Sequence, residues 1–146
     1  MLIDGSNSAN YVIYAAETLL QSPREEHNVV GEALFMKLVP FVIETYEAPR
    51  AVTSLCIVLW RCSRVGYRKY DLFDIVFSHL IDNGGQIMTL QQVCRVSISL
   101  ARLRVVVPEL MVLLVDRLDE ISRRDGEDVV RSYRIKILQE FSRLRK

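Results

Sequence analysis

The side chains of this chain that are best suited to recognition chemistry are arginines and glutamines. A guanidinium group binds phosphate oxygens in a bidentate geometry, and a carboxamide both donates and accepts hydrogen bonds at a base edge or a peptide group. We therefore predict a contact surface for a polyanion or a polar partner, with no catalytic residue. Its predicted members are Arg61, Arg64, Gln91, Gln92, Arg95, Arg102, Arg131 and Arg134.

The elements that position these residues are predicted to be helices. Apolar residues recur mostly at i, i+3, i+4 and i+7, and no alternating pattern is sustained, so the chain is expected to be all-α. On the segment that begins at Leu90, Ser99 is predicted to share the polar face with the arginines. Thr53 and Ser54 are predicted to hold comparable places on the helix before it. If these helices lie side by side, their polar positions form one continuous strip.

An internal repeat supports that arrangement. Residues 51–80 align without a gap on residues 89–118, which lie 38 positions further along. A fixed period of this size is typical of stacked helical repeats. We predict a right-handed stack of antiparallel helical hairpins, an α-solenoid, with about three and a half repeats; an ordinary helical bundle with hairpins of similar length is the alternative. The identical pairs are Cys56/Cys94, Val58/Val96, Arg64/Arg102, Leu72/Leu110 and Leu80/Leu118.

The predicted units form a single domain over residues 1–146. They cover residues 7–47, 50–85 and 88–122, followed by a terminal helix over 127–145. The second helix is predicted over about 30–47, with a kink or an irregular turn at Pro40. A polar segment over 23–28 is predicted before it, and a polar turn over 123–126 before the terminal helix.

Local signals at the helix ends, and one inward face, are also predicted. Thr89 with Gln92 forms a capping box, and Gly66 suits a left-handed C-terminal cap. Ser6 or Asn7 is predicted to cap the first helix, and Asp71 the fourth. The inner face of the first helix is predicted to carry Tyr11, Tyr14, Ala15, Thr18 and Leu19.

Composition excludes several function classes. The chain has 146 residues with 19 basic and 18 acidic side chains, so it lacks the strongly basic balance of many nucleic-acid-binding domains. Its last 16 residues are nevertheless basic, with six Lys and Arg against Glu140 alone, which is either a polyanion patch or a solvated helix face. No apolar run is long enough to span a membrane. The first ten residues resemble neither a signal peptide nor an Arg-rich presequence. This start is compatible with a chain from which a leader has been cleaved and equally with a fragment of a longer chain.

Catalytic and metal-binding motifs are not found in the sequence. Its two histidines, His27 and His79, have no partners at metal-ligand spacing, so we predict no metal and no cofactor. No phosphate-binding loop or nucleophile elbow occurs. The three cysteines lack a C-x-x-C spacing, and we predict them to be small core residues in a reducing compartment. They are Cys56, Cys62 and Cys94.

One stretch resembles a known repeat class. Residues 89–104, followed by Pro108-Glu109-Leu110-Met111 and Leu118, are similar to one unit of the octotricopeptide and heptatricopeptide class, which is close in pattern to the helical repeats of FAST-kinase-domain proteins. Residues 63–67 and 71–73 look like the same junction in the preceding unit. The resemblance implies an RNA-related role in a mitochondrion or plastid. Members often carry a C-terminal nuclease-like domain, for which we expect no room here.

Together these observations predict a non-catalytic subunit of an organellar ribonucleoprotein assembly, such as a mitochondrial ribosome or an RNA-processing complex. Its expected partners are organellar RNA and other protein subunits, with no membrane and no small-molecule substrate. The expected location is the mitochondrial matrix, or otherwise a reducing cytoplasmic compartment. The alternative is a protein-only scaffold of the armadillo or HEAT type. It would use the same surface or the apolar run Val105-Val106-Val107.

Overall fold

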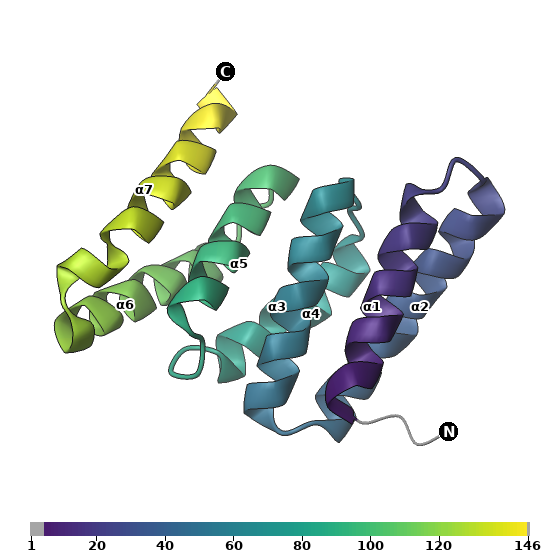
Figure 1. The fold of residues 1–146 in the computed structure, drawn as a ribbon, viewed down its shortest axis with the longest axis horizontal. Coiled ribbons are helices and arrows are strands. Elements are labelled where there is room, and N and C mark those ends of the chain that lie inside the picture. Colours follow the sequence, from purple (N-terminus) through teal and green to yellow (C-terminus); the bar gives the residue numbers. More distant parts are fainter. Residues whose placement is uncertain (1–4, 146) are drawn as a thin grey trace.

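The computed structural model describes the backbone of residues 5–145 and the side chains of residues 9–144. Over these residues the chain is helical and contains no strand, which confirms the predicted all-α class. Figure 1 shows the helical pairs following one another in chain order along the longest axis of the molecule. They are α1 (Gly5–Gln21), α2 (Glu25–Thr45), α3 (Ala48–Val65), α4 (Tyr70–Asn83), α5 (Leu90–Leu103), α6 (Pro108–Asp125) and α7 (Glu127–Ser142), with a 3₁₀ turn over Arg143–Arg145.

The helices form two layers. In the first layer α1 packs on α3, α3 on α5 and α5 on α7, while in the second α2 packs on α4 and α4 on α6 (Figure 1). Consecutive helices α1/α2, α3/α4 and α5/α6 also pack against each other and join the layers. The architecture is therefore all-α and helical-repeat-like. It places the odd-numbered helices, which carry the predicted contact residues, in one layer.

The helix ends follow the period of the sequence. α3 ends at Val65 and α5 at Leu103, and α4 begins at Tyr70 and α6 at Pro108, so both pairs are separated by 38 residues. Both first helices also end in a left-handed cap, with φ of 70° at Gly66 and 55° at Arg104. The two segments thus share their helix boundaries and C-terminal caps as well as their apolar pattern.

Burial agrees with the alignment at the identical pairs. Val58/Val96 and Leu72/Leu110 are fully buried, Cys56/Cys94 and Leu80/Leu118 are nearly so, and Arg64/Arg102 is exposed at both positions. The core runs between the layers because each helix turns these apolar positions toward the other layer and toward its neighbours. The predicted C-terminal cap at Gly66 and the capping box at Thr89 and Gln92 are both confirmed.

Several predicted boundaries are wrong. α1 begins at Gly5, so Ser6 and Asn7 lie within its first turn, and their side chains lie outside the described residues. α2 begins at Glu25, because Glu25 and Glu26 in its first turn favour a helix N-terminus. It continues through Pro40 to Thr45. The polar segment 23–28 is therefore largely helical. α6 likewise continues to Asp125, where a turn was predicted from residue 123.

The start of α4 also differs from the prediction. Lys69 is its N-cap residue and makes no side-chain capping bond, so Asp71 does not cap the helix. Asp71 instead lies in the first turn, where its charge favours the positive end of the helix dipole. The backbone N–H of Phe73 donates to the Lys69 carbonyl at 2.9 Å and begins the helical pattern.

Two residues of α2 hold α1 in place. Nδ2 of Asn28 donates to the carbonyl oxygens of Leu19 at 2.8 Å and Ser22 at 3.0 Å, which satisfies groups at the C-terminal end of α1. Gly31 lies against the same helix, and a Cβ atom there would approach the Ala16 carbonyl oxygen to 2.9 Å. The close α1–α2 contact fixes how α1 sits beside α3.

Candidate functional site

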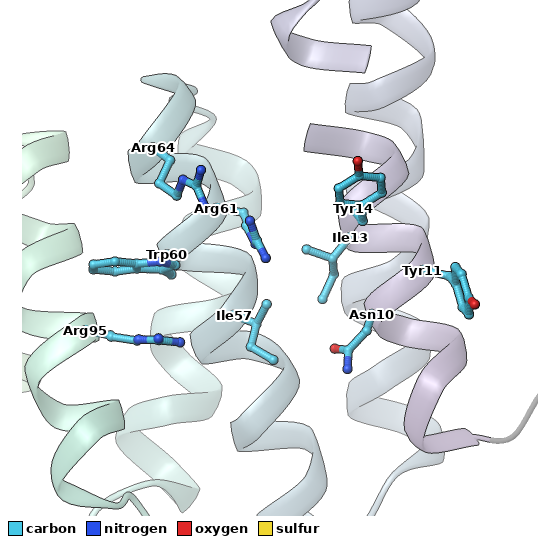
Figure 2. Close-up of a pocket in the computed structure, with 9 residues that line it drawn as sticks. All are labelled: Asn10, Tyr11, Ile13, Tyr14, Ile57, Trp60, Arg61, Arg64 and Arg95. Carbon is cyan, nitrogen blue, oxygen red and sulfur yellow. The ribbon is translucent and has the colours of Figure 1, made fainter. Parts of the chain in front are cut away.

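A hollow on the first layer lies between α1 and α3, with one lining residue from α5. It has a volume of about 650 Å³, within the range of small-molecule sites. Figure 2 shows Asn10 and Ile13 reaching from α1 toward α3, and Arg61 reaching back toward α1. The lining residues are Asn10, Tyr11, Ile13, Tyr14, Ile57, Trp60, Arg61, Arg64 and Arg95. Three of the predicted contact residues therefore meet in a single cleft.

Arg61, which lines this cleft, forms an ion pair with Glu17 of α1. Its Nη1 lies 3.2 Å from Oε1 of Glu17, whose side chain is buried while that of Arg61 is 31% exposed. Oε2 of Glu17 has no hydrogen-bond partner among the described residues, so Arg61 is the group that compensates the buried carboxylate. Because of this ion pair, Arg61 stabilises the α1–α3 contact and brings little net charge to the cleft. Burial and the nearby Glu17 charge also raise the pKa of the Cys62 thiol to about 12.

Arg64 and Arg95 differ from Arg61 in having no acidic partner. Among the residues whose side chains are described, no carboxylate lies within 4.0 Å of either guanidinium group. Arg64 is exposed near the C-terminal end of α3, and Arg95 is half-buried on α5. Both line the cleft. A cation without a neighbouring anion is free to bind a phosphate or carboxylate from outside.

Trp60 contacts two arginines of α5. The guanidinium carbons of Arg95 and Arg102 are each 5.2 Å from the centre of the indole ring, a cation–π distance. The two arginines stand seven residues apart in the sequence, which is about 10.5 Å along the helix axis. Figure 2 shows Arg95 on one side of the indole ring. Arg102 also reaches α7, where its Nη2 lies 3.2 Å from Glu140.

A smaller hollow of about 160 Å³ lies between α3 and α5. It shares Ile57 and Arg95 with the larger cleft, so the two hollows adjoin. Gln91 is exposed at its edge. Gln92 is occupied at both ends, because its Oε1 accepts from the Thr89 N–H at 3.0 Å and its Nε2 donates to Thr53 at 3.1 Å. Gln92 therefore serves the capping box and the α3–α5 contact, and Gln91 is the freer amide.

The two predicted contact residues of α7 are both ion-paired. Arg131 lies 3.3 Å from Asp128 on the same exposed face. Arg134 turns toward α6, where it contacts Asp119 at 2.9 Å, and it also contacts Glu127 at 2.8 Å. These two acids hold the pKa of the Arg134 guanidinium above its usual value. The structure therefore does not bring Arg131 and Arg134 to the cleft.

Sequence reasoning placed some polar and aromatic residues on the wrong face. Ser54 and Ser99 are buried, and Ser99 donates to the Arg95 carbonyl at 2.7 Å, so neither belongs to a solvated strip. Tyr11 and Tyr14 are 74% and 63% exposed, whereas Ile13 is buried in their place. The buried positions Ala9, Ile13 and Ala16 recur at helical spacing, which is the signal that could have shown this.

The three cysteines and the possible metal ligands are predicted to have no catalytic or metal-binding role. The cysteines are free and buried, as predicted, and burial raises the pKa of the Cys56 thiol to about 12, which keeps it protonated at neutral pH. Within the described part of the chain, no three His, Cys, Asp or Glu side chains are grouped to hold a metal ion. No described helix combines the length and apolar character needed to cross a membrane.

Comparison of the chain with protein-family models, with curated proteins and with solved structures finds no match. The resemblance to organellar helical repeats thus stays a prediction.

Proposed function

We propose that this chain is a short α-solenoid that binds RNA as a non-catalytic subunit of an organellar ribonucleoprotein assembly. The observation that carries the proposal is the pair Arg64 and Arg95, two arginines without acidic partners that line one cleft beside exposed aromatic residues. Guanidinium groups contact RNA phosphates, and aromatic side chains accommodate unpaired bases. The 38-residue spacing of the helix ends supports the repeat interpretation. The mitochondrial location rests on the sequence resemblance.

The positions of the acidic side chains support the cleft as the surface that binds an anion. Arg61 is offset by Glu17, Arg102 by Glu140, and both arginines of α7 by neighbouring acids. Of the six arginines predicted for the contact surface, only Arg64 and Arg95 have no acidic partner among the described residues, and both line the cleft. The nearly neutral chain needs such free cations to attract a polyanion, because its overall charge of +1 provides little attraction.

Salt dependence of RNA binding tests this proposal. We expect a fluorescein-labelled single-stranded RNA to bind with a log–log salt slope of roughly −0.7 for each phosphate neutralised. The double variant R64A/R95A should lower the steepness of that slope by about 1.4. A charge-matched control, R124A/R131A, removes two exposed arginines that are already paired with Asp125 and Asp128, and should leave the slope nearly unchanged. A wild-type slope near zero would overturn the proposal, as would equal effects of the two double variants.

A protein scaffold is the second candidate, and one observation favours it. Apolar side chains are exposed on α6 and α7 at the C-terminal end of the layers, namely Val112, Val115, Ile135 and Leu138. Exposed apolar groups gathered in one region are typical of a protein contact. Val106, in the connection between α5 and α6, is also exposed, while Val105 and Val107 pack against the core.

Purification of the native assembly with and without nuclease separates the two functions. A scaffold keeps its protein partners after RNA digestion, and Leu138→Glu should release them. An RNA-binding subunit loses its partners on digestion, and R64A/R95A should have the same effect as nuclease.

A further inference from the structure

The aromatic side of the α1–α3 cleft has chemistry that phosphate binding does not use. Tyr14 is exposed at the α1 edge of the cleft, and its ring makes no ring–ring or cation–π contact with any described residue. Figure 2 shows it beside Ile13, on the helix that faces Arg61 and Arg64 across the cleft. Tyr11 lies one turn earlier and points away from α3 (Figure 2). Tyr14 is therefore an unused aromatic surface next to unpaired cations.

We propose that this cleft is a subsite for an unpaired nucleotide of single-stranded RNA, with the base stacked on Tyr14 and the adjoining phosphates bound by Arg64 and Arg95. The inference rests on the proposed RNA-binding function and specifies which form of RNA the site takes. A nucleotide presents a flat ring and an anion a few bonds apart, and the cleft is lined by an aromatic ring on α1 and by guanidinium groups on α3 and α5. A base in a duplex is stacked on its neighbours and unavailable to Tyr14.

The shape of the site favours a nucleotide over an acidic peptide. A carboxylate side chain would satisfy Arg64 and Arg95 but would leave the face of Tyr14 uncovered. Ile57 of α3, which is partly buried, also lines the cleft, and a planar base can cover its exposed part together with the tyrosine ring. Arg61 is held by Glu17 and does not compete for the base. The cleft volume of about 650 Å³ is sufficient for a ligand of drug-like size.

Comparison of single-stranded and duplex RNA tests the inference. The probes are a fluorescein-labelled oligoadenylate and the same strand annealed to oligouridylate, measured by fluorescence anisotropy at one salt concentration. Base–aromatic stacking of about 1–3 kcal/mol corresponds to roughly 5- to 150-fold in affinity. We therefore expect Tyr14→Leu to weaken binding of the single strand by about tenfold or more and to leave duplex binding unchanged. Tyr14→Phe retains the ring and should retain single-strand affinity.

A matched control is available on the other layer. Tyr70, at the start of α4, is 61% exposed and, like Tyr14, lacks a ring or cation partner among the described residues. Tyr70→Leu should change neither single-strand nor duplex binding. Because Tyr14 and Tyr70 are both exposed, neither substitution removes a core contact, and circular dichroism should show unaltered helix content.

The possible outcomes separate this inference from the function on which it rests. If the wild type binds neither RNA, the proposed function fails. If it binds both and Tyr14→Leu weakens neither, or weakens both equally, RNA binding stands and the stacking subsite is wrong. If polyglutamate competes as well as oligoadenylate and Tyr14→Leu weakens both, the cleft accepts an acidic peptide and the inference is overturned. A selective loss for the single strand, restored by Tyr14→Phe, supports it.

Discussion

The two ends of this molecule use the same residue types for different purposes. At the N-terminal end, Arg64 and Arg95 line a cleft without acidic partners, and the apolar residues between α1 and α3 are covered. At the C-terminal end, Arg131 and Arg134 are paired with acids, while Ile135 and Leu138 are exposed. Arginine content alone therefore does not locate positive potential, since neighbouring carboxylates offset the charges of Arg131 and Arg134 but not those of Arg64 and Arg95. The position of the acids decides which end attracts an anion.

The contrast extends to two leucines that stand 38 residues apart, one on each of two neighbouring helices of the first layer. Leu100 on α5 is 1% exposed, whereas Leu138 on α7 is 68% exposed. α5 packs on α6 and lies between α3 and α7, whereas α7 has no following helix in either layer among the described residues. In a stack of helices, the last unit leaves uncovered the apolar positions that a next unit would bury.

The largest expected effect is a difference in the free energy of unfolding between alanine variants of Leu100 and Leu138. Leu100→Ala should lower the free energy of unfolding by about 2–5 kcal/mol, because it leaves a cavity in the core. Leu138→Ala should change it by no more than about 0.5 kcal/mol, since the side chain is already in solvent. Urea denaturation followed by circular dichroism measures both. Equal losses would show that Leu138 is covered in solution, for example by another molecule.

A smaller difference in stability is expected between variants that break the Arg61–Glu17 and Arg131–Asp128 ion pairs. Arg61→Ala leaves the buried Glu17 carboxylate without its partner, which should cost about 2 kcal/mol; the partial exposure of Arg61 keeps the loss below the 3–5 kcal/mol of fully buried pairs. Arg131→Ala breaks an exposed pair with Asp128 and should cost at most about 0.5 kcal/mol.

The same denaturation assay provides a control for this explanation. Adding Glu17→Gln to Arg61→Ala removes the uncompensated charge and should recover part of the lost stability. A double variant less stable than Arg61→Ala would show that the loss comes from packing rather than from the buried carboxylate.

The smallest expected effect compares the two left-handed caps. Gly66→Ala should destabilise the fold by about 1 kcal/mol, because a Cβ atom at φ of 70° is strained although no atom lies within 4 Å of it. Arg104→Gly relieves the same strain at φ of 55° and should raise stability by about 0.5–1 kcal/mol. Thermal unfolding of both variants gives the two signs directly. A loss of stability in Arg104→Gly would mean that the arginine side chain makes a contact worth more than the strain.

Local chemistry made part of the structure predictable. Thr89 and Gln92 stand three residues apart with the side chains that a capping box needs, and the reciprocal bonds form as expected. Gly66 tolerates positive φ, so the end of α3 could be predicted as well. Asp71 failed as a cap because Lys69, two residues earlier, already occupies the N-cap position. Capping depends on where the preceding chain turns, which a short motif does not specify.

The candidate site was less predictable than the helices. Tyr11 and Tyr14 are amphipathic side chains, and their spacing fits an inward face as well as an outward one. The smaller residues Ala9, Ile13 and Ala16 take the buried face because α1 lies close to its neighbours, and Gly31 on α2 permits that closeness. A contact between helices thus turned the tyrosines toward solvent.

The all-helical class, the 38-residue spacing of the helix ends and the burial of the matching apolar positions follow from residue spacing along a helix, and so they could be read from the residues alone. Which arginines keep a free charge depends on how the helices pack. Arg61 meets Glu17 across 44 residues and Arg102 meets Glu140 across 38, while Arg64 and Arg95 meet no acid among the described residues. An ion pair forms between side chains that packing brings within a few ångströms, and separation along the chain says nothing of that distance.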